Sequence, residues 1–258
     1  ENSEMILAID IGNTNIEVGC IQGDDIIFVE RIHTDSTKSE LEYAISIKTV
    51  LEIYGIDRKA LDGGIISSVV PPLTNVMRRA AAKVTGREIL VVGPGVKTGL
   101  DIRIDNPAQL GTGLVVGAVA GVEEYSCPLV IIDMGTATTF TVVNEKKQVM
   151  GGMIMPGVSV ALDSLINRTS QLPKISLDPP KKFIGSNTVE CMKSGVLYGN
   201  AVCLDGMIAR VEEELGQKVT AVATGGMAKY IVPYCRTPVS LDDALLLKGL
   251  KLIYRRNF

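Results

Sequence analysis

The sequence has little net charge and no long apolar run. Its 258 residues carry a formal net charge of −3, whereas nucleic-acid-binding domains are usually strongly basic. The longest apolar stretches, such as residues 129–132, are far too short to span a bilayer. The polar opening segment, residues 1–4, lacks the features of a secretory signal. We therefore expect a cytoplasmic protein with neither a nucleic acid nor a membrane as its partner.

Histidine and paired cysteines are also scarce. His33 is the single histidine, which disfavours a zinc site. A catalytic triad would have to use His33 or be a variant without histidine. The five cysteines form no Cys-x-x-Cys pair, and their odd number and irregular spacing indicate reduced thiols.

The chain does contain a regular alternation of apolar strands and amphipathic helices. Short apolar runs bounded by Gly, Asp or Pro predict strands at 5–9, 16–21, 26–32, 64–70, 88–92, 128–132, 139–144, 149–154 and 219–223. Apolar residues at helical spacing predict helices that include 39–54, 73–84, 189–215 and 241–254. Strands that are followed by helices indicate an α/β fold. The irregular segment 171–185 is expected to be a surface excursion.

One strand-and-turn pattern occurs twice. Residues 7–15 align with residues 130–138, so that Asp10 falls on Asp133 and Gly12 falls on Gly135, about half a chain apart. This repeat predicts an internal duplication with two similar lobes, 5–118 and 119–258, and a cleft between them.

The repeated loops have the composition of a phosphate site. Glycine permits a tight turn and lets backbone N–H groups approach a phosphate. An Asp at the strand end would repel phosphate directly, but it can hold a cation or its water shell that bridges to phosphate. Small neutral donors follow each Asp: Asn13, Thr14, Asn15, Thr136, Thr138 and Thr139. A single Asp-Gly turn is often only a turn, whereas two copies in register favour nucleotide binding.

A third loop, Thr224-Gly225-Gly226, follows a later strand. Its composition suits packing against an adenine or ribose, and it equally suits a helix-entry turn.

Several longer segments extend this pattern along almost the whole chain. They are Asp10-Ile11-Gly12-Asn13-Thr14-Asn15, Ser67-Ser68-Val69-Val70-Pro71-Pro72, residues 91–100, Asn106-Pro107-Ala108-Gln109-Leu110-Gly111, residues 132–139, 152–157, 185–188, 223–226 and 247–250. With these motifs the chain resembles the type III pantothenate kinases, within the superfamily of actin, sugar kinases and acetate kinase. The resemblance implies two duplicated ribonuclease H-like (actin-like ATPase) lobes with mixed sheets and an inter-lobe cleft.

The resemblance also implies an activity. Members of the family phosphorylate pantothenate with ATP and Mg²⁺, the first step toward coenzyme A. They use a monovalent cation, K⁺ or NH₄⁺, and form a homodimer whose partner chain helps to close the pantothenate pocket.

Site residues carry over by position. The ATP loop corresponds to Asp10, Ile11, Gly12, Asn13, Thr14, Asn15, Ile16 and Glu17, and Thr136 also contacts ATP. Asp133 corresponds to the monovalent-cation ligand. Thr188 and the segment Gly111, Thr112, Gly113 and Leu114 correspond to substrate-binding positions.

The chain departs from the family pattern at the position of catalysis. After Asn-Pro-x-x-x-Gly the family has Ala-Asp-Arg, but here Gly111 is followed by Thr112-Gly113-Leu114. Gly113 stands where the family keeps the Asp that accepts the hydroxyl proton, and Leu114 where it keeps a substrate-binding Arg. Ile104 also replaces a Tyr that is usual in the substrate pocket. The catalytic residue is therefore unknown, and nothing in the spacing brings Asp101 or Asp105 to the vacated position.

Three functions follow as alternatives. The first is a pantothenate kinase that is impaired by these losses. The second is an inactive nucleotide-binding paralogue with a regulatory or hetero-oligomeric role. The third is a kinase of the same architecture for a different, less acidic small substrate.

Overall fold

The computed structural model describes residues 3–258; residues 1–2, part of the opening segment considered above for a secretory signal, lie outside the described residues. The chain divides into two compact units. Unit 1 comprises the chain up to Gly99, Asn106–Ala120 and Leu245–Phe258, and unit 2 comprises Leu100–Asp105 and Gly121–Ala244. The chain passes from unit 1 into unit 2 after Ala120, and the expected boundary between the lobes is at residue 118. The C-terminal helix, however, groups with the first half of the chain.

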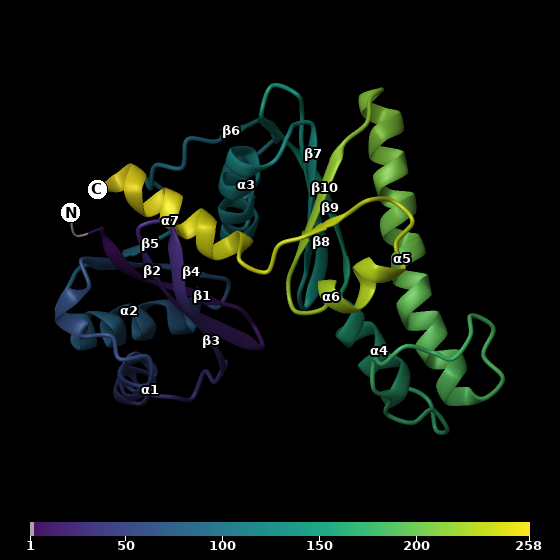
Figure 1. The fold of residues 1–258 in the computed structure, drawn as a ribbon, viewed down its shortest axis with the longest axis horizontal. Helices are drawn as coiled ribbons and strands as arrows, with labels where there is room; N and C mark the ends of the chain where they lie inside the picture. The colour runs from purple at the N-terminus through teal and green to yellow at the C-terminus, as the bar shows by residue number, and fades with distance from the viewer. Residues whose placement is uncertain (1–2) are drawn as a thin grey trace. The chain divides into compact units, whose positions relative to one another are not determined.

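Unit 1 is built on a five-stranded mixed sheet in the order β3-β2-β1-β4-β5. Its strands are β1 (Met5–Ile11), β2 (Asn15–Gln22), β3 (Asp25–His33), β4 (Gly63–Ser68) and β5 (Ile89–Val91). Strands β1, β2 and β3 run antiparallel in sequence, and β4 runs parallel to both β1 and β5. Helices α1 (Glu40–Ile53) and α2 (Pro71–Thr85) pack on one face, and α7 (Leu245–Asn257) packs on the other (Figure 1).

Unit 2 is built on a six-stranded mixed sheet in the order β11-β10-β7-β8-β9-β6. Its strands are β6 (Asp101–Ile102), β7 (Leu129–Met134), β8 (Ala137–Val143), β9 (Gln148–Pro156), β10 (Thr220–Thr224) and β11 (Ser240–Leu241). Helices α4 (Val158–Asn167), α5 (Thr188–Leu215) and α6 (Ala228–Ile231) contribute to its core beside β7 and β8. Helix α3 (Thr112–Glu124) carries the chain from unit 1 into unit 2.

Local sequence signals set the helix ends. Ser39 and Glu42 form a capping box at the start of α1. Asn187 caps α5, where its side chain accepts the backbone N–H of Glu190. Gly86 and Gly216 end α2 and α5 in the left-handed conformation, with φ of 66° and 70°.

The two sheets share one topology. The order β3-β2-β1-β4-β5 in unit 1 matches β9-β8-β7-β10-β11 in unit 2, and each corresponding pair runs in the same relative direction. Strand β6 is an addition at the edge of unit 2. Asp10 and Asp133 are each the second-last residue of the central strand, β1 or β7. The predicted α/β fold of two mixed sheets is confirmed.

The two loops differ by one residue, so the ungapped alignment of 7–15 with 130–138 is wrong beyond the glycines. Asp10 pairs with Glu17, whereas Asp133 pairs with Thr139. The reason is the turn. The N–H of Gly12 donates to the carbonyl of Asn15, and the N–H of Gly135 donates to the carbonyl of Ala137, which closes a shorter loop.

One predicted helix begins later than expected. The segment predicted as helix 241–254 starts with β11, and α7 begins at Leu245. The N–H of Asp242 donates to the carbonyl of Ala223, so sheet pairing extends past the strand and delays the helix. Within residues 3–258, no helix is long and apolar enough to cross a membrane.

Candidate functional site

The first loop has a braced backbone and exposed polar side chains. The Thr34 hydroxyl donates to the carbonyl of Gly12 (2.7 Å), and the Thr34 N–H donates to the carbonyl of Thr14 (3.0 Å). A Cβ at residue 12 would lie 3.0 Å from the carbonyl oxygen of Asn15, which explains the glycine. Asn13, Thr14 and Asn15 are all exposed. The loop is therefore held in shape while its donors face solvent, as a phosphate site requires.

Asp10 lies in a row of polar residues that crosses the sheet. Glu17 on β2 and Ser67 on β4 are its register partners on either side, and Arg31 on β3 is the next partner beyond Glu17. The Ser67 hydroxyl donates to Oδ1 of Asp10 at 2.7 Å. Arg31 forms an ion pair with Glu17 at 3.0 Å. The half-buried Asp10 carboxylate thus has a fixed donor on one side and a charge-compensated neighbour on the other.

The start of α3 is tied to the same strand end. The Thr112 hydroxyl donates to the carbonyl of Ser68 at 2.9 Å, and the N–H of Val69 donates to the carbonyl of Ile11 at 3.0 Å. Residues 111–114, predicted to bind substrate, therefore lie beside the strand pair that carries Asp10. The structure brings these two groups of predicted residues together within unit 1.

Gly113 sits in the first turn of α3 with open space around it. An added Cβ would meet no heavy atom within 4 Å, and its φ is not in the positive range. Leu114 is half-buried. The backbone at this position therefore permits a side chain, so the glycine is not required by the local fold.

The second loop, in unit 2, has two buried hydroxyl groups without partners. Asp133 is the second-last residue of β7, and Thr139 lies opposite it on β8. The hydroxyls of Thr138 and Thr139 are buried and, within residues 3–258, have no hydrogen-bond partner. Unsatisfied buried polar groups are costly and uncommon. The position of Thr139 opposite Asp133 fits a site that a bound cation or its water completes, whereas Thr138 pairs with Met134 and its side chain faces the other side of the sheet. Thr136 is exposed.

The third loop acts as a helix-entry turn. Gly225 has a φ of 95°, and a Cβ there would lie 2.6 Å from the carbonyl oxygen of Met134. The N–H of Met227 donates to the same carbonyl, and α6 begins one residue later. Close packing on β7 and entry into α6 account for the glycine without a nucleotide.

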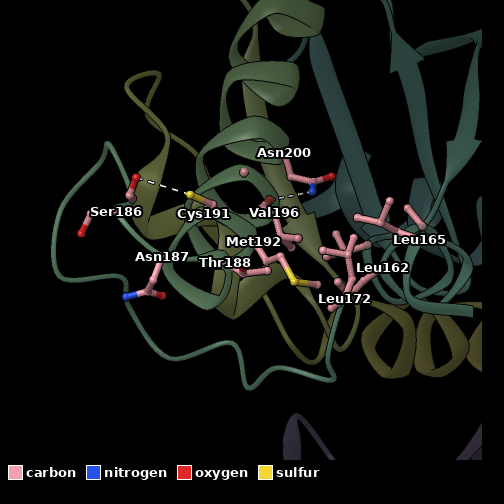
Figure 2. Close-up of a pocket in the computed structure, with 14 residues that line it drawn as sticks. Leu162, Leu165, Leu172, Ser186, Asn187, Thr188, Cys191, Met192, Val196 and Asn200 are labelled. Carbon is pink, nitrogen blue, oxygen red and sulfur yellow. Dashed lines mark hydrogen bonds between the residues drawn. The ribbon is translucent and has the colours of Figure 1, made fainter. Parts of the chain in front are cut away.

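Thr188 lines a cavity of about 760 Å³ in unit 2. Figure 2 shows Leu162, Leu165, Leu172, Met192 and Val196 along its apolar wall, with Ser186, Asn187 and Thr188 at the start of α5. None of the fourteen described residues that line the cavity is Asp, Glu, Lys or Arg. The cavity suits an uncharged, partly apolar group better than a carboxylate.

The excursion at residues 171–185, which follows α4, is held to α5 by polar contacts. The nearly buried Lys193 forms an ion pair with Asp178 at 2.9 Å. The N–H of Lys181 donates to Glu190 at 2.8 Å, and the Ser194 hydroxyl donates to the carbonyl of Phe183. The Ser176 hydroxyl, and then Lys193, lower the pKa of Asp178 to about 2. These contacts order a segment that the sequence presents as irregular.

The two carboxylates that precede the substrate segment in the sequence, Asp101 and Asp105, belong to unit 2. Asp101 is exposed and binds Arg103 at 2.6 Å and Gln148 at 3.0 Å; the bond from Arg103 lowers its pKa. Asp105 is exposed, and Ile104 lies beside Gly151. Among residues 3–258, no group of three or more His, Cys, Asp or Glu side chains could hold a metal ion.

Sequence reasoning missed Ser67. Ser67 lies in the motif 67–72, but the sequence around it indicates no role for its side chain. The two serines, Ser67 and Ser68, that end the apolar run 63–66 are the signal that could have identified it.

Comparison with solved structures finds α/β proteins of the same fold. The activator of the 2-hydroxyisocaproyl-CoA dehydratase from Clostridium difficile, solved with bound ADPNP, matches with a TM-score of 0.53 at 12% identity, over 98% of this chain and 93% of that one. The ethanolamine utilization protein EutJ from Carboxydothermus hydrogenoformans also has a TM-score of 0.53, at 13% identity over 96% and 89% of the two chains. At these identities the likeness shows the actin-like ATPase fold alone.

Sequence comparison gives the family. The family described as type III pantothenate kinase matches residues 6–210. A type III pantothenate kinase from Exiguobacterium sp. is 42% identical over 98% of this chain and 99% of its own length. One from Moorella thermoacetica is 41% identical over 98% and 100% of the two chains. The chain belongs to the type III pantothenate kinase family.

Proposed function

We propose that the protein binds Mg²⁺·ATP at the first loop and transfers a phosphoryl group to pantothenate slowly. The observation that carries this proposal is the arrangement within unit 1. Asp10 has a fixed orientation beside an open phosphate loop, and the first turn of α3 lies alongside it without a carboxylate at Gly113.

The residues of the first loop fit a magnesium nucleotide. Mg²⁺ prefers oxygen ligands and keeps several waters. The half-buried carboxylate of Asp10 can bind such an ion or its water, while the loop N–H groups and the exposed side chains of residues 13–15 bind the phosphates. Magnesium would neutralise the charge on the transferring phosphoryl group.

A monovalent cation, K⁺ or NH₄⁺, would be held at Asp133. The unpartnered hydroxyl of Thr139 opposite Asp133 supports this assignment, because such an ion takes neutral oxygen ligands as well as a carboxylate. Thr136 follows on the same loop and would contact ATP. A homodimer is part of the proposal, with Thr188 at the mouth of the substrate pocket. An enzyme that consumes ATP would act in the cytoplasm.

The side chains that the resemblance implies at residues 113 and 114, an Asp and an Arg, are absent, and this limits the rate. Gly113 cannot accept a proton, and Leu114 cannot bind a carboxylate. General-base catalysis typically supplies about 10²–10⁴-fold in rate, whereas positioning and electrostatics carry most of phosphoryl transfer. We therefore infer weak kinase activity and no complete loss.

A second candidate function is phosphorylation of a less acidic substrate. The absence of charged side chains among the described residues that line the unit 2 cavity favours it, together with Leu114 in place of arginine. A third, an inactive nucleotide-binding paralogue with a regulatory or hetero-oligomeric role, predicts ATP binding without any turnover.

A coupled ADP-release assay tests these alternatives. Wild-type protein should turn over pantothenate far below the roughly 1–100 s⁻¹ that is typical of kinases. The double variant Gly113→Asp/Leu114→Arg should recover part of the rate, because the glycine site has room for a side chain. Thr85→Ala, at the end of α2, serves as the control and should not raise the rate. Wild-type turnover at a normal kinase rate would contradict the proposal.

A further inference from the structure

Ser67 is a buried hydroxyl that points at a functional carboxylate. Its side chain is 1% exposed, and its hydroxyl donates to Oδ1 of Asp10 at 2.7 Å. An ionised carboxylate only accepts hydrogen bonds, so the direction of this bond is determined. Hydrogen bonds to a charged acceptor are stronger than those between neutral groups.

The backbone around Ser67 leaves the hydroxyl little freedom. Ser67 pairs with Asp10 in the parallel register of β1 and β4. Thr112 donates to the carbonyl of the next residue, Ser68, and the N–H of Val69, two residues after Ser67, donates to the carbonyl of Ile11. Strand end, loop and α3 therefore hold Ser67 at a defined distance from Asp10.

The opposite neighbour of Asp10 makes this donor important. Glu17 lies next to Asp10 on β2, and two adjacent carboxylates repel each other. Arg31 compensates Glu17 through its ion pair at 3.0 Å. The Ser67 hydroxyl draws the Asp10 carboxylate toward β4, away from Glu17.

The internal duplication supplies an independent comparison. In unit 2, Thr224 on β10 stands opposite Asp133 as Ser67 stands opposite Asp10. Thr224 is also buried, at 2% exposure. On the other side the two units differ, with Glu17 in one and Thr139 in the other. A buried hydroxyl on the parallel neighbour is the feature that both Asp residues share.

We propose that Ser67 is a positioning residue, whose hydroxyl holds the Asp10 carboxylate in the orientation that binds Mg²⁺·ATP. The inference rests on the proposed function of the first loop. It predicts that the Mg²⁺-dependent part of ATP affinity depends on a hydroxyl at residue 67, and that threonine, the residue at the corresponding position in unit 2, can supply it.

Isothermal calorimetry with ATP, in Mg²⁺ and in EDTA, tests the proposal. Ser67→Ala should lower the affinity measured in Mg²⁺ by about 3- to 10-fold, the loss expected for one hydrogen bond. The affinity in EDTA should not change. Ser67→Thr should restore the value in Mg²⁺ to within about twofold. Ser67→Cys, with a similar size and a weak donor, should resemble the alanine variant and serves if that variant does not fold.

Two further variants separate the possible failures. Thr85→Ala removes another buried hydroxyl of unit 1, which donates to the carbonyl of Ala81 at 2.8 Å, and it should leave both affinities unchanged. Equal losses in Ser67→Ala and Thr85→Ala, an unchanged Ser67→Ala, or a threonine variant as weak as alanine would overturn the positioning role. If instead Asp10→Ala and wild type bind Mg²⁺·ATP equally, the proposed function of the loop itself fails.

Discussion

At the scale of single residues, Gly113 is the position where sequence and structure together are most informative. The sequence shows that a carboxylate expected from the family resemblance is absent. The structure adds that the backbone still has the shape of an ordinary helical first turn, with room for a side chain. The backbone at Gly113 would therefore accept the carboxylate that the resemblance implies for this position.

This predicts that Gly113→Asp is tolerated. Glycine within a helix is destabilising by roughly 0.5–1 kcal/mol relative to alanine, and an acidic residue near a helix N-terminus is favoured by the helix dipole. The variant should therefore melt at the same temperature as wild type or slightly above it in differential scanning calorimetry. Gly225→Asp is the contrasting control and should lower the melting temperature, because its φ is 95° and Met134 blocks a side chain. A clear loss of stability in Gly113→Asp would show that the turn has changed in solution.

A second residue-scale prediction concerns the cation at Asp133. ATP affinity should be higher in K⁺ or NH₄⁺ than in Na⁺, because the site carries buried oxygens that a larger, weakly hydrated ion satisfies. Asp133→Asn should remove the difference, and Thr139→Val should reduce it. Thr141→Val, two residues further along β8, is the matched control. Equal affinities of the wild type in K⁺ and Na⁺ would count against the assignment.

At the scale of elements, the sequence predicts those strands and helices whose positions are set by neighbouring residues. Apolar runs that end in Asp-x-Gly locate β1 and β7, and a cap followed by helical spacing locates α5. Long-range pairing is not visible locally. The pairing of Asp242 with Ala223 displaced the start of α7, and the tighter turn at Gly135 shifted β8 by one residue. Ser67 was missed for the same reason, since its partner is distant in the sequence.

The excursion fastened to α5 gives an element-scale prediction. Asp178→Asn should leave the nearly buried ammonium of Lys193 without its carboxylate, which is unfavourable. We expect faster cleavage of residues 168–187 in limited proteolysis and a lower melting temperature. Asp163→Asn, on exposed α4, is the control. Lys193→Met in the Asp178→Asn background should recover part of the loss.

The pH dependence of this contact follows from the lowered pKa. The folded-state pKa of Asp178 is about 2, below the usual value of an unfolded Asp, about 3.9. The stabilisation is therefore complete above about pH 4 and is lost as the pH falls toward 2. The difference between wild type and Asp178→Asn should shrink over that interval, and a difference that is constant with pH would contradict the ion pair.

At the scale of the whole molecule, unit 1 depends on the C-terminal helix. Leu245, Leu247, Leu250 and Ile253 of α7 are fully buried. Burying such a side chain contributes about 1.5–3 kcal/mol, so the four together approach the total stability of a typical domain, about 5–15 kcal/mol. Helix α7 packs on β1 and β4. If residues 5–118 folded without this helix, the surface of β1 and β4 that it covers would be exposed.

Deletion of residues 245–258 should therefore unfold unit 1 and spare unit 2. Hydrogen exchange should show lost protection in β1, β2 and β4 and retained protection in β7, β8 and β10. Removal of Phe258 alone, whose side chain is 66% exposed, is the control and should change little. Retained protection in β1 after the longer deletion would show that the helix is dispensable.

The position of α7 in the chain has a consequence for biosynthesis. Domains commonly fold while the chain is still being made, starting from the N-terminus. Here all the segments of unit 2 have been synthesised once residue 244 is added, whereas unit 1 lacks its last helix until residues 245–258 have been added. The unit whose first segment is made earliest is thus completed last, and Asp10 and Ser67 reach their final setting only after α7 has been made. If the first loop binds ATP as proposed, a chain that stops before residue 245 should bind it more weakly than the intact protein does.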